Sequence, residues 1–253
     1  MAERSHLAAR DVSVGFADKT VLEQVDVEFS PRAINALIGP TGCGKSTFLR
    51  SLNRMNDKVR GYWRTGSILL DGTEVTTGGL DPLELRRRVG MVFQRPNPFP
   101  MSIRDNVVVG VKVHGMASKR ELSGIAEAKL RQVGLWPAVA DRLDDSPFRL
   151  SGGQQQLLCL ARALAVEPEV LLLDEPTSSL DPVTTEMVEK MLLELAPTLT
   201  MVIVTHNLAQ ARRVAQTTTF FYNGRLVETG DTRKMFEDPD QPETVSYVSG
   251  RIG

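Results

Sequence analysis

The sequence predicts an α/β protein with a mostly parallel sheet at its core, and three observations support this fold class. Two short, mainly apolar segments, Ile34–Ile38 and Val170–Leu173, have the pattern of parallel strands that are covered on both faces. Helical patterns follow strand patterns along the chain. Val25–Phe29 alternates apolar and polar residues, which predicts an antiparallel strand with one wet face.

The composition limits the classes of protein to consider. The chain has 253 residues, of which 42% are hydrophobic and 24% charged, enough for one large α/β domain or two small lobes. A net charge of -1 implies no general attraction to nucleic acid or membrane. Two cysteines give no disulfide framework, and charges at Glu3, Arg4 and Asp11 argue against a signal peptide, so we expect a reducing, cytoplasmic setting. The apolar runs are too short to span a membrane, so work at a membrane would need a partner.

A glycine-rich segment follows the first apolar strand and fits the phosphate-binding P-loop pattern G-x-x-x-x-G-K-[ST]. Glycines let the backbone turn tightly and aim its N–H groups at a polyphosphate, and the lysine and the hydroxyl that follow suit phosphate oxygens and Mg²⁺. A helix predicted at Ser46–Met55 adds a partial positive charge. The alternative is that a glycine-rich turn matches this pattern by chance, and the predicted strand and helix on either side argue against it. The segment is Gly39, Pro40, Thr41, Gly42, Cys43, Gly44, Lys45, Ser46 and Thr47.

The first 75 residues also predict a small antiparallel sheet beside this loop. Its strands are Ala8–Phe16, Val25–Phe29 and Ser67–Leu70, the last followed by an Asp71-Gly72 turn. Phe16 stands in a short polar turn. Its residue type alone favours a hydrophobic side chain in the core or at the edge of the sheet. The more specific interpretation is that its ring stacks on an adenine base.

The middle of the chain predicts a helix starting at Asp81, a strand at Val89–Phe93 that ends at Gln94, and then a loop at 95–101. Three prolines in that loop forbid a helix or a central strand there. It is either a rigid loop or a docking surface for another protein. Residues 103–133 read as mostly helical, with a capping box at Ser118 and Glu121, and 142–150 reads as a loop.

Two further segments carry candidate chemistry. Leu150–Gln154 places Ser-Gly-Gly before a helix predicted at Gln155–Val166, which suits either an anion site or an ordinary N-cap. Asp174 and Glu175 close the buried strand at Val170–Leu173. Two acids in a row are often a solvated turn. At the end of a buried strand in a P-loop protein, they suit a Mg²⁺ ligand, Asp174, and a general base, Glu175.

The last third of the chain predicts alternating helices and strands. Asp181 reads as the N-cap of a helix that runs to about Leu195. A buried strand at Leu199–Thr205 ends at His206, which is either a structural histidine or part of the edge that holds Glu175. A hairpin with an Asn223-Gly224 turn and two short helices complete the chain.

Six markers, in this order, resemble the ATPases of ABC transporters over essentially the whole chain. They are the P-loop, Gln94, Leu150–Gln154, Asp174–Glu175, Ser179–Asp181 and His206. The Ser-Gly-Gly-Gln signature is highly specific to that family. More narrowly, four stretches resemble the ATP-binding subunits of bacterial phosphate importers: Leu52–Asp57, Phe93–Ile103, Ser146–Gln156 and Tyr247–Gly253.

This resemblance implies a fold and a set of residue roles. The fold would be a P-loop NTPase with a RecA-like core and an antiparallel β subdomain (7–94 and 158–238), an α-helical subdomain (about 95–157) and a helical tail (239–253). ATP and Mg²⁺ would bind in a head-to-tail homodimer. Phe16 would stack on adenine, and Gly39–Thr47 would bind phosphates. Ser46 and Gln94 would ligate Mg²⁺, Glu175 would be the general base, and Lys45 and His206 would contact the γ-phosphate. From the other copy, Ser151, Gly152, Gly153 and Gln154 would reach the same ATP, and Asp181 would couple the two sites.

The same resemblance implies partners and a location. Two transmembrane permease subunits would dock on the loop after Gln94 and the helical lobe, and an extracytoplasmic phosphate-binding protein would deliver inorganic phosphate for uptake. A regulatory protein also fits this scheme, and nucleic acid does not. The chain would lie peripherally on the cytoplasmic face of the cell membrane. Three residues are atypical or reactive: Leu157 replaces a basic residue, Ser179 a common alanine, and Cys43 lies inside the P-loop.

Other functions explain the residues less well. An importer of another small solute has the same motifs. A soluble ABC ATPase of translation or DNA repair usually carries two cassettes or a coiled-coil insertion, and the composition offers no basic face for nucleic acid. A P-loop kinase or small GTPase leaves the Ser151–Gln154 segment unexplained.

Overall fold

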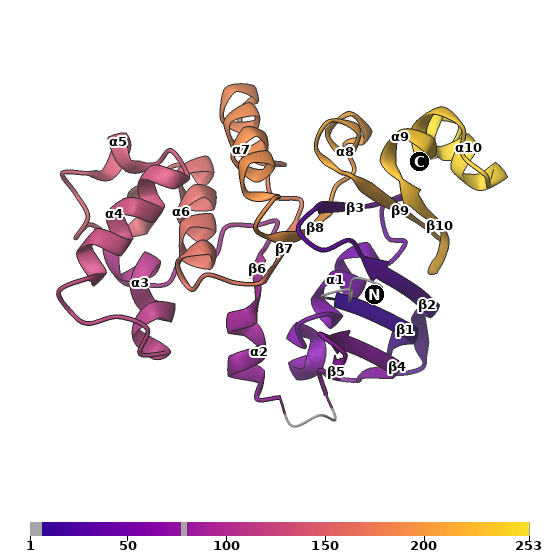
Figure 1. The fold of residues 1–253 in the computed structure, drawn as a ribbon, viewed down its shortest axis with the longest axis horizontal. Helices are drawn as coiled ribbons and strands as arrows, with labels where there is room; N and C mark the ends of the chain where they lie inside the picture. The colour runs from indigo at the N-terminus through magenta and orange to yellow at the C-terminus, as the bar shows by residue number, and fades with distance from the viewer. Residues whose placement is uncertain (1–6, 77–79, 253) are drawn as a thin grey trace. The chain divides into compact units, whose positions relative to one another are not determined.

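A computed structural model describes residues 7–76 and 80–252, and Gly253, the last residue of the predicted tail, lies outside them. Figure 1 shows the order of the elements along the chain. The strands are β1 (Leu7–Phe16), β2 (Lys19–Phe29), β3 (Ile34–Ile38), β4 (Tyr62–Leu70), β5 (Thr73–Glu74), β6 (Val89–Val92), β7 (Val170–Asp174), β8 (Thr200–Val204), β9 (Thr217–Tyr222) and β10 (Arg225–Asp231).

Most of the helices come after β5, and several of them follow one another without an intervening strand. The helices are α1 (Lys45–Ser51), α2 (Pro82–Arg88), α3 (Ile103–Val113), α4 (Leu122–Gln132), α5 (Trp136–Val139), α6 (Gly152–Ala165), α7 (Pro182–Leu195), α8 (Leu208–Val214), α9 (Thr232–Glu237) and α10 (Pro242–Val248), with 3-10 helices η1 (Met55–Lys58) and η2 (Pro147–Arg149). None of the described helices is both long enough and apolar enough to cross a membrane.

The chain divides into two compact units, which we describe separately. The strand-rich unit comprises the residues up to Arg86 and those from Ala196 onward, and the helix-rich unit comprises Arg87–Leu195. The finer division predicted from the sequence, with a helical lobe at about 95–157 and a tail at 239–253, stays a prediction.

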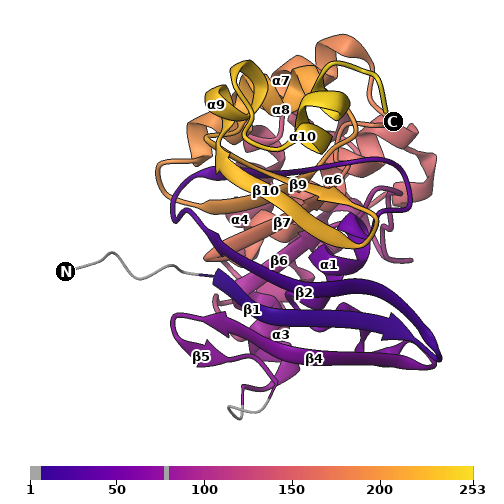
Figure 2. The same cartoon turned by 90° about the vertical axis from the view of Figure 1, so that its right-hand side faces the viewer.

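One sheet of the strand-rich unit is antiparallel, with strand order β2-β1-β4-β5 (Figure 2). In β2 the side chains of Val25, Val27 and Phe29 are buried, while those of Asp26 and Glu28 are exposed. The predicted alternation is therefore confirmed, although β2 begins at Lys19, six residues earlier than the alternation indicates.

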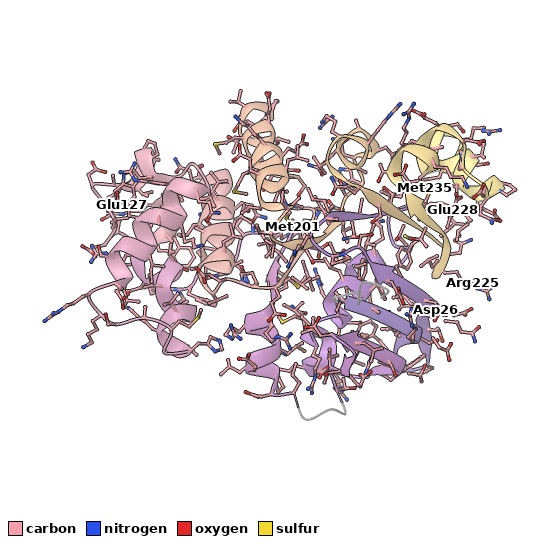
Figure 3. The ribbon with its side chains drawn as sticks, in the orientation of Figure 1. Asp26, Glu127, Met201, Arg225, Glu228 and Met235 are labelled. Carbon is pink, nitrogen blue, oxygen red and sulfur yellow. The ribbon has the colours of Figure 1, made fainter. Side chains whose placement is uncertain are left out.

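The other strands of this unit have the order β10-β9-β3-β8, with β3 parallel to both β8 and β9. Every residue of β3 and β8 is buried, as expected of parallel strands covered on both faces. Figure 3 shows the contrast between Met201, which lies in the interior, and Asp26 and Arg225, which point outward. Phe48 of α1 joins the two sheets, because its ring lies 6.4 Å from that of Phe29 in β2 and 5.4 Å from that of Phe221 in β9.

A buried amide fixes β3 between its neighbours. Asn35, 2% exposed, donates from Nδ2 to the carbonyl oxygens of Met201 (3.1 Å) and Ser30 (3.1 Å). Its Oδ1 accepts from the Ser30 N–H (2.8 Å) and from the Thr217 hydroxyl (2.6 Å). One polar side chain thus connects β3 to the starts of both parallel partners, in a strand that the sequence pattern presents as apolar.

In the helix-rich unit, β6 and β7 form a parallel pair, and α6 packs against α3 and α4 (Figure 1). All five residues of β7 are buried. The approach of α3 to the end of α6 is close, because a Cβ on Gly110 would lie 2.5 Å from Val166 Cγ1. Leu157, where the resemblance predicts a basic residue in many relatives, is 5% exposed, so its aliphatic side chain belongs to this core.

Three helix boundaries differ from the prediction. The helix predicted at Ser46–Met55 ends at Ser51, because Arg54 adopts a left-handed conformation (φ 62°) before η1 begins. Helix α6 starts at Gly152 and not at Gln155, since Ser151 is its N-cap. The Ser118–Glu121 pair is one-sided: the Glu121 carboxylate accepts from the Ser118 N–H and hydroxyl, and α4 begins only at Leu122.

We predict that Asn35→Leu lowers the free energy of unfolding by about 2–4 kcal/mol, because it leaves several buried groups without hydrogen bonds. Urea denaturation of the isolated protein measures this change. Thr217→Val, which removes only one of the hydrogen bonds of this amide, should cost about 1 kcal/mol. An Asn35→Leu protein as stable as the parent would contradict the role given to this amide.

Candidate nucleotide site

The loop Gly39–Thr47 connects the buried strand β3 to α1, and its glycines adopt conformations that other residues rarely reach. The φ angles of Gly39, Gly42 and Gly44 are 145°, 82° and 106°. A Cβ on Gly39 would lie 2.1 Å from the Phe221 carbonyl oxygen, and one on Gly44 would lie 2.6 Å from Leu22 Cδ2. Gly39 is therefore required both by its φ angle and by the nearby backbone, whereas at Gly42 and Gly44 the φ angle is the main reason for glycine.

Lys45 turns back into this loop. Its Nζ donates to the carbonyl oxygens of Gly39 (2.6 Å) and Pro40 (2.8 Å) and lies 3.6 Å from Cys43 Sγ. The residue is 7% exposed, and its hydrogen-bond partners within the described residues are neutral oxygens and sulfur, with no carboxylate among them. A buried ammonium without a counter-charge is suited to an anion, so a phosphate group fits this loop.

Phe16 ends β1 and lies opposite Tyr62 of β4, with ring centroids 5.8 Å apart. The Tyr62 hydroxyl donates to Ser51 Oγ (3.2 Å), and the Ser51 hydroxyl donates to the Thr47 carbonyl (2.8 Å). Asn56 Nδ2 also donates to that carbonyl (2.9 Å). Burial raises the pKa of Tyr62, so its hydroxyl keeps its proton. This chain of contacts links Phe16 to the last residue of the loop.

Tyr62, Ser51 and Asn56 were not predicted as site residues. The sequence contains a signal for Asn56, because it is a polar residue of the Leu52–Asp57 stretch that carries the resemblance, and it is 4% exposed. No short-range pattern points to Tyr62, since its partner Ser51 lies eleven residues away on another element.

A pocket of about 340 Å³ opens beside the loop in the same unit. It lies between the first half of the P-loop, the start of β2 and the turn between β9 and β10. Its lining residues are Lys19, Thr20, Val21, Pro40, Thr41, Gly42, Cys43, Tyr222, Asn223 and Gly224.

His206 follows β8 by two residues and is exposed. Strand β8 pairs with β3 in a register that places Val204 opposite Leu37, and the Thr205 N–H donates to the Leu37 carbonyl (3.3 Å). His206 therefore lies at the edge of the sheet where β3 ends and the P-loop begins, as expected for the carboxyl ends of parallel strands.

In the helix-rich unit, Gln94 and Glu175 come together although 81 residues separate them. Strands β6 and β7 pair with Val92 opposite Leu173, and the side chains that follow meet: Gln94 Nε2 donates to Glu175 Oε2 (2.9 Å). Glu175 has a φ of 46°, which is uncommon for a residue other than glycine and often marks a functional site. Asp174, one residue earlier, is 0% exposed.

The segment Ser151–Gln154 forms the capping box of α6. Ser151 Oγ accepts from the Gln154 N–H (3.3 Å), and Gln154 Oε1 accepts from the Ser151 N–H (3.1 Å). The N-cap interpretation is therefore correct locally, and Ser151 and Gly152 remain exposed. A Cβ on Gly153 would lie 3.2 Å from Leu180 Cδ2, so this segment is next to the Ser179–Asp181 turn.

Asp181 caps α7, as predicted. Its carboxylate accepts from the Thr184 N–H (3.0 Å) and hydroxyl (2.6 Å), and these bonds lower its pKa. The side chain is nevertheless exposed, so the cap leaves the carboxylate at the surface of the unit.

Comparison with known proteins decides the family. The profile described as "ABC transporter" matches residues 22–178, from β2 to the turn after Glu175. The chain belongs to the ABC transporter family. The predicted family and fold class are thereby confirmed, and family membership implies ATP binding. The roles given to individual residues of the site stay predictions.

Curated relatives and solved structures agree with this assignment. A protein of Mycobacterium tuberculosis named "Phosphate import ATP-binding protein PstB 2" is 60% identical over 247 residues, covering 98% of this chain and 89% of its own. "Phosphate import ATP-binding protein PstB" of Mycobacterium intracellulare is 60% identical over 243 residues, covering 96% and 85%. The structure titled "Structure of a bacterial Atm1-family ABC exporter with ATP bound" matches with a TM-score of 0.82 and 25% identity, covering 100% of this chain and 43% of that one.

We predict that modification of Cys43 blocks nucleotide binding, because its Sγ is buried beside the Lys45 ammonium and Gly39, where an adduct would displace the loop. The chain has two cysteines, so in a Cys159→Ser variant only Cys43 can react with N-ethylmaleimide. The dissociation constant for ADP should rise more than about tenfold on complete modification, a change of about 1.4 kcal/mol or more. Unchanged affinity of protein shown by mass spectrometry to be fully modified would contradict the prediction.

Proposed function

We propose that this chain is the ATP-hydrolysing subunit of an ABC importer that takes up inorganic phosphate. The observation that carries the proposal is the 60% identity, over nearly the whole chain, to proteins named as phosphate import ATP-binding proteins. An alignment of this length spans the P-loop and the signature segment together with the regions between them.

ATP would bind first to the strand-rich unit. Phe16 would stack on the adenine, with Tyr62 supporting its ring from behind. The backbone N–H groups of Gly39–Thr47 would surround the phosphates, and Lys45 would exchange its two carbonyl partners for phosphate oxygens. Because the ammonium is already buried, little desolvation cost is added when the nucleotide arrives.

The family resemblance assigns further residues to the terminal phosphate. Ser46, Gln94 and Asp174 would hold Mg²⁺, whose charge offsets that of the phosphates when it is bound. The Gln94 amide donates through its nitrogen to Glu175, which leaves its carbonyl oxygen as the group for Mg²⁺. Glu175 would take the proton from the attacking water, oriented by this same amide, and His206 would contact the γ-phosphate.

A head-to-tail homodimer would complete each site. Ser151, Gly152 and Asp181 are exposed, although their capping bonds are satisfied within their own unit. In the proposed dimer, Ser151–Gln154 of one copy would meet the γ-phosphate bound by the other copy, with Asp181 beside it. ATP would then close the dimer, and loss of the γ-phosphate after hydrolysis would open it.

The membrane partners would receive this motion. Two permease subunits would dock on the loop after Gln94 and on the helical lobe, where Phe99 and Phe148 are 42% and 59% exposed. An extracytoplasmic phosphate-binding protein would supply the substrate, and a regulatory protein would control the assembly. In this arrangement the chain lies on the cytoplasmic face of the membrane and takes no part in binding nucleic acid.

We predict that Glu175→Gln binds ATP and forms a stable ATP-dependent dimer but loses turnover by about 10²–10⁴-fold, because the amide cannot accept the proton of the attacking water. Steady-state hydrolysis and size-exclusion chromatography with ATP measure the two effects. Glu194→Gln, the same change at an exposed carboxylate near the end of α7, should leave turnover unchanged. Hydrolysis at the parent rate by the Glu175→Gln protein would remove Glu175 from this role.

We expect ATP hydrolysis to depend on orthophosphate when the protein is reconstituted in liposomes with its permease subunits and the phosphate-binding protein. Adding phosphate to the binding-protein side should raise turnover and drive uptake of labelled phosphate. Sulfate at the same concentration is the control anion. Stimulation by another solute and not by phosphate would favour an importer of that solute. Hydrolysis that does not change when the permeases are present would favour a non-transport ATPase.

A further inference from the structure

The C-terminal helix α10 reaches the P-loop through one side chain. Tyr247, near the end of α10, accepts a hydrogen bond at its Oη from the Gly39 N–H (3.2 Å). The two residues are 208 positions apart and belong to the same strand-rich unit. Tyr247 is 6% exposed, so this bond is shielded from water.

Stacking fixes the direction of the Tyr247 ring. It lies on the ring of Phe220 in β9, with centroids 4.8 Å apart and planes inclined by 18°. The register of β9 with β3 places Phe220 opposite Ile38, the residue before Gly39. The phenol therefore lies on the strand next to the one that leads into the loop, with its hydroxyl at the first residue of that loop.

The Gly39 residue is consequently held on both sides. Its N–H donates to Tyr247, and its carbonyl accepts from Lys45 Nζ at 2.6 Å. It lies beyond the end of β3 and has a φ of 145°, so the sheet ladder no longer fixes its orientation. Burial raises the pKa of Tyr247, so the phenol stays protonated and is the neutral acceptor of this bond.

We propose that Tyr247 is a positioning residue of the nucleotide site, and that through it α10 sets the conformation of the P-loop before nucleotide binds. The inference rests on the proposed function only in that ATP binds at the P-loop. A loop whose first peptide is already oriented loses less conformational entropy when phosphates arrive, and so binds them more tightly. Coupling of this kind is reciprocal, so nucleotide at the loop also stabilises the docked position of α10.

The test compares two hydroxyl deletions in α10 of the full chain. Tyr247→Phe keeps the ring that stacks on Phe220 and removes only the acceptor. Thr244→Val removes a buried hydroxyl that has no hydrogen-bond partner among the described residues. The dissociation constant for ADP with Mg²⁺ should rise about 3- to 10-fold in Tyr247→Phe and less than about 2-fold in Thr244→Val. Equal effects in the two variants would overturn the proposal.

Hydrogen exchange of the unmodified chain gives a second readout that does not depend on a variant folding. Addition of ADP with Mg²⁺ should slow exchange in Pro242–Val248 as well as in the P-loop, and in Tyr247→Phe the slowing should be confined to the loop. Protection of the loop without any change in α10 of the parent protein would overturn the proposal. A Lys45→Ala variant distinguishes the failure of the proposed nucleotide site from the failure of the role of Tyr247. If Lys45→Ala binds ADP as tightly as the parent, the proposal that nucleotide binds at this loop is wrong. If Lys45→Ala loses ADP affinity and Tyr247→Phe does not, only the role of Tyr247 is refuted.

Discussion

The left-handed turn at Gly39 is the constraint on which the nucleotide-binding half of this protein depends. A side chain there would meet the Phe221 carbonyl at 2.1 Å, so β9 could not stay paired with β3 while the loop kept its path. The same peptide supplies the carbonyl that holds Lys45 inside the loop. Pairing of the sheet and placement of the buried cation therefore both depend on one residue.

The strands that lead to the candidate site residues have one feature in common. Each is buried along its length and becomes polar at its carboxyl end or just beyond it: β3 leads to the P-loop, β8 to Thr205 and His206, and β7 to Asp174 and Glu175. Burial on both faces makes these strands rigid, so the residues that follow them start from fixed positions. Glu175 goes further, because its left-handed backbone turns its side chain toward Gln94 on the neighbouring strand-end.

Much of this could be predicted because it is local. Mainly apolar runs predict β3 and β7, and the Asp181 cap and the Ser151–Gln154 box arise from residues three positions apart. The end of α1 could not be predicted in the same way. Residues 46–55 are compatible with a helix, but Asn56 and Ser51 side chains take the Thr47 carbonyl and Arg54 turns left-handed. Tyr62 and Tyr247 act over eleven and 208 residues, so no periodicity reveals them.

These two phenols suggest how the loop combines rigidity with adaptability. Tyr247 holds the first residue of the loop through the Gly39 N–H, and Tyr62 holds the last through Ser51 and the Thr47 carbonyl. Between these ends Thr41 and Gly42 are exposed, and a Cβ on Gly42 would meet nothing within 4 Å. The ends are fixed by groups far away in sequence while the middle has room to move, so the loop can adjust to bound phosphates without disturbing β3 or α1.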